Sequence, residues 1–269
     1  MKDIVHFSKF NPSGNMTVLV DSVHVESAYV PIANQLMQTS HVCCEQVGFV
    51  IRPQSSNDLY GLHMSGNEFC GNATLSMLHY LMERDLVPIG KLSLHVSGVS
   101  TPTVCEIHAL GDYEATLPAP HAYEWTTLVL GTEKFDVLKI TYASYCHFVV
   151  PVVTFDEALY RDVETFVTSQ TWSKSFKTIG LLLYDAERCQ LHPLIYVPEL
   201  GSIIWEQSCG SGTGSIGVYE ALQQPEKCTD SMVHQPGGVL RVCAQMAASP
   251  LITIRGHVKT VATGLAYIE

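Results

Sequence analysis

The amino-acid sequence predicts an α+β protein built as two similar halves. Short strand-like segments dominate its 269 residues, and only a few stretches have helical periodicity. Each half contains strands, a helix, more strands, a helix that begins after a cysteine, and strands again, which indicates an internal duplication. A chain of this length suits one large domain or two moderate ones, and the repeated order favours two.

The first half begins with strands and an amphipathic helix. Strand-like segments at residues 4–10 and 16–20 flank the turn Asn11–Gly14. The next segment carries apolar residues at helical spacing on one face: Tyr29, Ile32, Ala33, Leu36 and Met37. Short strands at residues 46–51 and 59–64 precede a helix that starts at Cys70 and runs to about Arg84. Three further strands complete the half: residues 91–98, 102–110 and 113–118.

The second half repeats this order. Strands lie within residues 135–152, and a helix follows whose apolar face is Leu159, Val163, Phe166 and Val167. Strands at 178–185, 191–197 and 202–207 lead to a helix that starts at Cys209, and the last strands are 239–245, 250–258 and 261–268. Two prolines interrupt the pattern near Leu117–Trp125. We therefore expect domains at residues 1–119 and 120–258.

The composition argues against several classes of function. Only 15% of the residues are charged and the net charge is −11, which disfavours nucleic acid and anionic membranes as partners. The first residues carry no export signal, and the most apolar run, residues 140–155, is interrupted by His147 and Pro151. Nine cysteines without regular spacing or a Cys-x-x-Cys pair argue against a disulfide framework or a zinc site. We expect a soluble protein of the reducing cytoplasm, without a metal.

Two cysteines stand out because their settings match. Cys70 in "EFCGNAT" and Cys209 in "SCGSGTGS" each precede a run of small residues that leads into a helix. A helix start carries unpaired N–H groups and partial positive charge, so it binds carboxylates and stabilises a thiolate. The pKa of such a cysteine can fall from about 8.5 to roughly 3.5–7.5. Either residue could then act as a base near neutral pH.

A pair of such cysteines suits one reaction. If the two halves face each other, their helix starts converge on one cleft with a thiol on either side. One thiolate removes the proton from the α-carbon of an amino acid, and the opposite thiol delivers a proton to the other face, so the stereocentre inverts. The N–H groups around Gly71, Asn72, Gly210 and Ser211 would stabilise charge on the substrate carboxylate. The reaction needs no cofactor.

Each motif also has a simpler interpretation. A single cysteine is more often a buried structural thiol, and only the pair of similar settings favours catalysis. The run Gly210–Ser215 could form a dinucleotide or phosphate loop, but the lysine of such a loop is absent. An amino-acid-binding protein without activity would use the same N–H groups, although it gives no reason for two thiols. A hydrolase with one catalytic cysteine is a further alternative, and His234–Gly238 is most simply a turn.

The two cysteine motifs together resemble the diaminopimelate epimerase family of cofactor-independent racemases and epimerases. More closely, "ANQLMQTSHVCCEQVGF", "IWEQSCGSGTGSIGV" and "VATGLAYIE" resemble the histidine racemases of staphylopine-type metallophore biosynthesis. The resemblance covers essentially the whole chain. It implies two pseudo-symmetric domains, each a mostly antiparallel sheet wrapped around a central cysteine-led helix, with residues 259–269 returning to the first domain. The implied activity is racemisation of L-histidine to D-histidine for such a metallophore.

The resemblance also assigns roles to residues. It implies that Cys70 and Cys209 are the acid–base pair and that Asn15 and Gln46 contact the substrate. Glu45 and Glu206 flank the motifs, where a carboxylate could hold the α-ammonium group or shift the pKa of a thiol. A turn residue is the alternative for Asn15, and an exposed surface glutamate is the alternative for the two acids, more so for Glu45.

Departures from the family pattern bear on the substrate. Where diaminopimelate epimerases carry Gly-Asn-Pro-His this chain has Ser144–His147, and where they carry Glu-Arg-Gly it has Trp205–Gln207. The arginine that would hold a distal carboxylate is missing, which argues against diaminopimelate. A neutral imidazole needs apolar or aromatic walls and one or two hydrogen bonds, which residues 144–147 and Trp205 could help provide. We expect histidine as the small-molecule partner, with diaminopimelate-type or proline-type substrates as alternatives, and leave a homodimer open.

Overall fold

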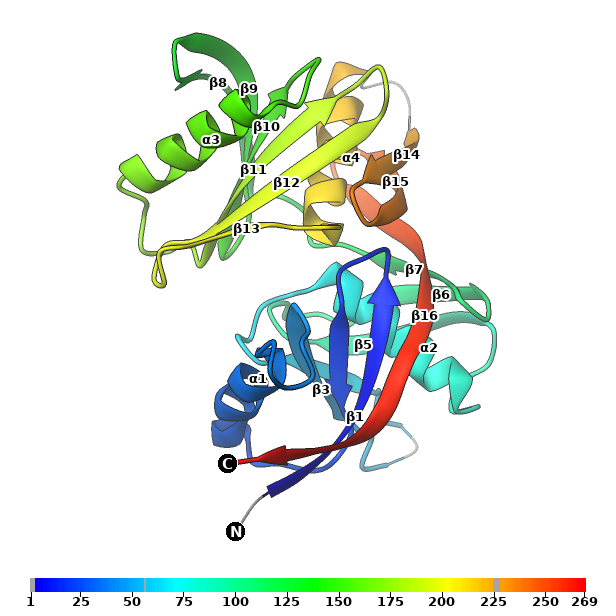
Figure 1. The fold of residues 1–269 in the computed structure, drawn as a ribbon. Coiled ribbons are helices and arrows are strands. Elements are labelled where there is room, and N and C mark those ends of the chain that lie inside the picture. Colours follow the sequence, from blue (N-terminus) through cyan, green and yellow to red (C-terminus); the bar gives the residue numbers. More distant parts are fainter. Residues whose placement is uncertain (1–2, 56, 225–227) are drawn as a thin grey trace. The chain divides into compact units, whose positions relative to one another are not determined.

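The computed structural model describes residues 3–55, 57–224 and 228–269, which form two compact units (Figure 1). The first unit ends at Thr116 and resumes with Ile254–Glu269, and the second is Leu117–Thr253. The boundaries expected from the sequence, after residues 119 and 258, lie a few residues further along the chain. Both units combine sheets with helices, so the α+β prediction is confirmed.

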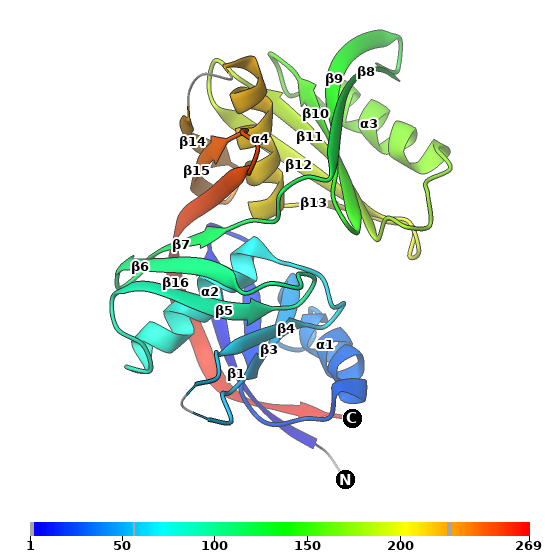
Figure 2. The same cartoon turned by 180° about the vertical axis from the view of Figure 1, so that it is seen from behind.

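The sheet of the first unit is closed, because its last strand pairs with its first. Its strand order is β1-β2-β3-β4-β5-β6-β7-β16, and Figure 2 shows β4 to β7 side by side. β16 pairs with β1 from Ile268 opposite Asp3 to Val258 opposite Pro12, so the C-terminal segment belongs to this unit. The strands are β1 (Asp3–Pro12), β2 (Thr17–Val20), β3 (Gln46–Ile51), β4 (Gly61–Met64), β5 (Gly90–Val96), β6 (Thr103–Ala109), β7 (Asp112–Thr116) and β16 (Leu251–Ile268).

The helix that follows Cys70 lies against several strands of this closed sheet. α2 (Gly71–Glu83) buries every residue from Gly71 to Leu81 and contacts β1, β2, β3, β4 and β7. A helix buried on all sides lacks the polar face of a surface helix. The 3-10 helix η1 (Glu26–Ala28) leads into such a surface helix, α1 (Tyr29–Met37), which contacts β3. Its buried face is Tyr29, Ile32, Ala33 and Leu36, as the sequence predicts, whereas Met37, the fifth residue predicted on this face, is half-buried.

The second unit has an open sheet with the order β15-β14-β12-β11-β10-β9-β8, and β13 pairs with β12. α4 (Gly210–Gln223), which follows Cys209, contacts β10, β11, β14 and β15, whereas α3 (Glu157–Ser169) contacts β8 and β11. The strands are β8 (Ala122–Leu130), β9 (Glu133–Thr141), β10 (Tyr145–Pro151), β11 (Thr178–Asp185), β12 (Gln190–Val197), β13 (Ser202–Trp205), β14 (Thr229–Gln235) and β15 (Gly238–Gln245).

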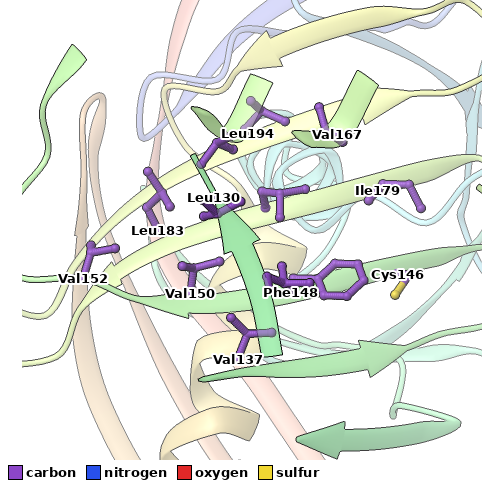
Figure 3. Packing of buried hydrophobic residues seen from close by; sticks show 13 residues of the cluster. Leu130, Val137, Cys146, Phe148, Val150, Val152, Val167, Ile179, Leu183 and Leu194 are labelled. Atoms are coloured by element: carbon purple, nitrogen blue, oxygen red, sulfur yellow. The ribbon is translucent and has the colours of Figure 1, made fainter. Parts of the chain in front are cut away.

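Alternation along β10 separates the two faces of this sheet. Cys146, Phe148 and Val150 belong to the apolar cluster that also includes Val163 and Val167 of α3 (Figure 3). Because successive strand residues point to opposite faces, His147 lies on the other face, where it bonds to α4. The apolar cluster therefore lies between the sheet and α3, and α4 packs against the opposite face of the sheet.

The two units share one connectivity, which confirms the predicted duplication. In the first unit β2 and β3 are parallel across α1, β3 and β4 are antiparallel, and β4 and β5 are parallel across α2. In the second unit β10 and β11 are parallel across α3, β11 and β12 are antiparallel, and β12 and β14 are parallel across α4. Parallel neighbours need such crossovers. The cysteine-led helix is the second crossover in both units.

Two strands were not predicted from the sequence. β8 lies in the segment that was expected to join the halves, and most of its side chains are exposed. β14 is polar, and it is held mainly by its pairing with β15. Neither segment has the apolar alternation on which strand prediction depends, because pairing rather than burial stabilises them.

None of the helices in the described part of the chain is both long and apolar enough to span a bilayer.

Candidate active site

Cys70 caps the N-terminus of α2. It has extended backbone angles, φ −131° and ψ 114°, and its Sγ accepts a hydrogen bond from the N–H of Ala73 at 3.4 Å. The Thr74 hydroxyl donates to the Cys70 carbonyl oxygen at 2.8 Å and strengthens the first turn. Side chains that cap the first turn satisfy N–H groups that the helix leaves unpaired. The predicted helix start is confirmed.

A chain of hydrogen bonds connects Cys70 to two other residues expected at the site. The thiol donates to Gln46 Oε1 at 2.9 Å, and Gln46 Nε2 donates to the Thr17 hydroxyl at 2.7 Å. Thr17 in turn donates to the carbonyl oxygen of Asn15, a buried residue, at 3.2 Å. The structure thus brings Asn15, Gln46 and Cys70 together. Sequence reasoning missed Thr17, which has no motif of its own.

Cys209 caps α4 in nearly the same way. Its backbone angles are φ −122° and ψ 109°, and its Sγ accepts a hydrogen bond from the N–H of Gly212 at 3.3 Å. The Thr213 hydroxyl donates to the Cys209 carbonyl oxygen at 2.7 Å, as Thr74 does in the first unit. A Cβ atom on Gly212 would lie 3.2 Å from this sulfur. Glycine therefore leaves room for the buried thiol to reach the N–H group.

The electrostatic setting of Cys209 differs from that expected for a helix start alone. Burial raises the pKa of the Cys209 thiol well above its ordinary value, and the charge of Glu206 and a hydrogen bond to this carboxylate raise it further. Hydrogen bonds from Ser211 and Gly212 lower the pKa, but they are the weaker influences. Burial and the neighbouring carboxylate therefore both favour the protonated form of the Cys209 thiol.

A buried glutamine holds the backbone of Cys209 in place. Gln235 Oε1 accepts the N–H of Cys209 at 2.7 Å, and its Nε2 donates to the Thr213 hydroxyl at 2.9 Å. The turn predicted at residues 234–238 is present, because Gln235 pairs with Gly238 across the β14–β15 hairpin. Sequence reasoning missed the second role of Gln235, since nothing local distinguishes a turn glutamine from one that reaches a distant helix.

An aromatic cluster packs beside the α4 helix. The hydroxyl of Tyr142 and Nδ1 of His147 each lie 2.8 Å from the Ser215 hydroxyl on α4. The Tyr145 ring stacks on Tyr142 with centroids 4.3 Å apart and lies 4.9 Å from the His147 ring. Burial lowers the pKa of His147 to about 3, so its imidazole is neutral near pH 7.

The remaining candidate residues lie in different surroundings. Gly71 and Asn72 are buried in the first turn of α2, Gly210 is buried in the first turn of α4, and the Ser211 hydroxyl lies 3.5 Å from the Cys209 sulfur. Glu45 is exposed, next to Gln46. Trp205, considered from the sequence as a pocket wall, donates its indole N–H to Glu164 of α3 at 2.7 Å and packs against Tyr160.

The chain is similar along its whole length to histidine racemases. The family model described as the histidine racemase CntK N-terminal domain matches residues 4–267. A histidine racemase of Staphylococcus aureus (strain Mu50) is 48% identical, and the match covers 100% of this chain and 99% of that protein. A histidine racemase of Fusobacterium nucleatum subsp. nucleatum is 26% identical, and the match covers 98% of each chain.

Solved structures of low sequence identity share the fold. A probable proline racemase from Agrobacterium radiobacter K84 has a TM-score of 0.67 at 10% identity and covers 97% of this chain and 92% of its own. A hydroxyproline epimerase from Agrobacterium vitis has a TM-score of 0.63 at 10% identity and covers 98% and 93%. These likenesses confirm the predicted epimerase-like fold. With the family model matched from end to end and nearly half of the residues shared with the S. aureus protein, the chain belongs to the histidine racemase family.

Proposed function

We propose that the protein interconverts L-histidine and D-histidine by proton transfer at the α-carbon, without a cofactor. The observation that carries this proposal is the pair of cysteine-capped helices, Cys70 on α2 and Cys209 on α4, which occupy the same position in two units of the same connectivity. Inversion of a stereocentre by a two-base route needs an acid and a base on opposite faces of the carbon. Two thiols in equivalent settings supply one of each, and membership of the histidine racemase family supports the substrate.

The neighbours of the two thiols support a division of roles. Cys209 holds its proton because of burial and Glu206, so it is suited to deliver a proton while Cys70 removes one. In the opposite direction Cys209 must be the base, and we expect Glu206, which is hydrogen-bonded to it, to receive its proton. Cys70 donates to Gln46 Oε1 in its thiol form. A half-turn of the Gln46 amide presents Nε2 instead, so the same side chain also suits a thiolate.

We propose that the substrate carboxylate is bound by N–H groups of both helix starts, those of Gly71, Asn72, Gly210 and Ser211. Charge develops on this carboxylate as the α-proton leaves, and helix N-termini stabilise it without reorganisation. The α-ammonium group then needs acceptors. Asn15 and Gln46 beside Cys70 and the carboxylates of Glu45 and Glu206 are the candidates, and the exposed Glu45 is the weakest of them.

We propose that the D-histidine serves a staphylopine-type metallophore, that the protein acts in the cytoplasm, and that it has no nucleic-acid partner. The resemblance over the whole chain supports the first of these points, and the net charge of −11 supports the last. A pathway that builds a metal-binding molecule from D-histidine needs an enzyme that supplies this enantiomer.

The assignment is tested by incubating L-histidine, L,L-diaminopimelate and L-proline separately with chelator-treated protein under reductant. Chiral chromatography should show histidine approaching an equal mixture of enantiomers, and proton NMR in deuterated water should show loss of its α-proton signal. The other two amino acids should stay nearly unchanged. Faster turnover of either one would reassign the substrate, and binding of histidine without exchange would indicate a binding protein.

We also propose that the protein is a homodimer through the outer surface of β1 and β16. Ile4 and Tyr267 are opposite each other in register and so share a face, on which Leu265 also lies; their exposed fractions are 47%, 56% and 53%. Val261 and Leu265 line a neighbouring hollow of about 520 Å³. Adjacent exposed apolar side chains of this kind are typical of an association surface.

The dimer is tested by light scattering after size-exclusion chromatography. The unaltered protein should have twice the mass of the chain, and Leu265→Glu should release monomers because it places a charge in an apolar interface. Val129→Glu on the second unit is the matched control, since Val129 is equally exposed at 52%. A monomer at micromolar concentration would contradict the proposal.

A further inference from the structure

Tyr145 occupies a distinctive position at the start of β10. Its ring stacks on the ring of Tyr142 at an interplanar angle of 17°. The ring of His147, two residues further along β10, is tilted by 47° to the Tyr145 ring. Tyr145 itself is half-buried, whereas Tyr142 and His147 are buried. It is therefore the member of the aromatic cluster that is accessible to a small molecule.

The polar groups of this cluster differ in their hydrogen bonds. Tyr142 and His147 both bond to Ser215, which fixes them to the helix that Cys209 caps. The Tyr145 hydroxyl, by contrast, has no hydrogen-bond partner among the residues that the structure describes. Tyr145 is half-buried and its hydroxyl is not among the buried unpaired atoms of the described residues, so solvent can reach it. A ligand that displaces this water can take over its hydrogen bond.

The pKa of Tyr145 responds to the charge state of Cys209, the cysteine that caps α4. Burial is the main reason that its pKa is raised well above the ordinary value, and the charges of Tyr142 and Cys209 add to it. The Cys209 charge acts on Tyr142 as well, after burial and other contacts. The phenol therefore stays protonated at any working pH and can donate a hydrogen bond within electrostatic reach of Cys209.

We propose that Tyr145 recognises the side chain of the substrate, with its ring against the imidazole and its hydroxyl bonded to one ring nitrogen. This inference rests on the proposed histidine racemase function and names the residue that makes the site selective. A neutral imidazole has one N–H donor and one nitrogen acceptor, and a phenol can serve either. Aromatic rings of this size pack favourably edge-to-face or offset.

The Tyr145 hydroxyl would make the site selective for histidine over phenylalanine. Phenylalanine has a ring of similar shape but no ring nitrogen, so it would displace water from the Tyr145 hydroxyl without bonding to it. A site built to bond a polar group rejects analogues that lack it for this reason. Tyr145→Phe should therefore weaken the preference for histidine and leave the proton-transfer groups intact.

The test compares Tyr145→Phe with Tyr142→Phe, a neighbouring tyrosine whose hydroxyl is occupied by Ser215. The Tyr145 variant should lose about 3- to 10-fold in kcat/KM for L-histidine, mainly through KM, as expected for one neutral hydrogen bond. Inhibition by L-phenylalanine should become stronger, because the hydroxyl that this analogue leaves unpaired is gone. The pH profile should not change. Tyr142→Phe should retain the unaltered KM for histidine, although its thermal stability should fall.

Three outcomes would overturn the inference: an unchanged KM in Tyr145→Phe, a loss confined to kcat, or an equal rise of KM in both variants. If Tyr145→Phe does not fold, histidine labelled with ¹⁵N in its ring provides a second measurement on the unaltered protein. Binding should shift one ring nitrogen resonance, and unshifted resonances would contradict a hydrogen bond. Lack of histidine turnover by the unaltered protein would contradict the proposed function itself, and recognition of imidazole would fall with it.

Discussion

Cys70→Ala and Cys209→Ala should each abolish racemisation in both directions. Each direction uses one thiol as base and the other as acid, and loss of such a group typically lowers the rate by about 10² to 10⁴. Because the enantiomers have equal free energies, kcat/KM measured from L-histidine and from D-histidine must fall by the same factor. Polarimetry from both sides measures this loss.

The cysteine that remains in each alanine variant shows which enantiomer it acts on. Each alanine variant should still exchange the α-proton of the one enantiomer that faces its remaining cysteine, which deuterium incorporation measured separately on L- and D-histidine would detect. Cys70→Ser and Cys209→Ser distinguish the loss of proton transfer from the loss of the helix cap, because serine caps a helix well but is a much weaker base than a thiolate. Cys105→Ala is the control, since Cys105 is a buried thiol on β6 whose pKa burial raises to about 12. Substantial racemisation by either alanine variant would exclude the two-base mechanism.

Glu206→Gln should lower kcat/KM by about 10²-fold and move the alkaline limb of the pH profile to lower pH. The Glu206 carboxylate raises the pKa of Cys209, after burial. A neutral amide removes that contribution, so the pKa of Cys209 falls and the thiol loses its proton at a lower pH than in the unaltered protein. The rate falls as well, because the group that receives the Cys209 proton is lost. A pH series of kcat/KM measures both effects.

The control for this prediction is Glu220→Gln on α4, the helix that Cys209 caps. Glu220 accepts hydrogen bonds from Tyr184 and Ser231, so its loss should reduce stability without moving the alkaline limb. If Glu206→Gln lowers the rate but leaves that limb in place, Glu206 acts on the substrate rather than on Cys209. The coupling of this carboxylate to the thiol would then be wrong.

Local sequence signals were sufficient for much of the architecture. The apolar face of α1 follows from helical spacing, and the starts of α2 and α4 follow from a cysteine ahead of small residues that enter a helix. The duplication is visible because each unit repeats the same order of elements. The strands β8 and β14 were missed because their stabilisation comes from neighbouring strands.

The sequence by itself determined the two cysteine-capped helices and the duplicated α+β arrangement, because caps and periodicities are properties of neighbouring residues. Only the tertiary structure decided the surroundings of the thiols. Thr17 lies 29 residues from Gln46, and Gln235 lies 26 residues from Cys209, yet hydrogen bonds join each pair. The raised pKa of Cys209 likewise depends on burial by the folded chain, which outweighs the helix start. Burial and contacts between distant segments exist only once the strands have paired, so no local pattern can contain them.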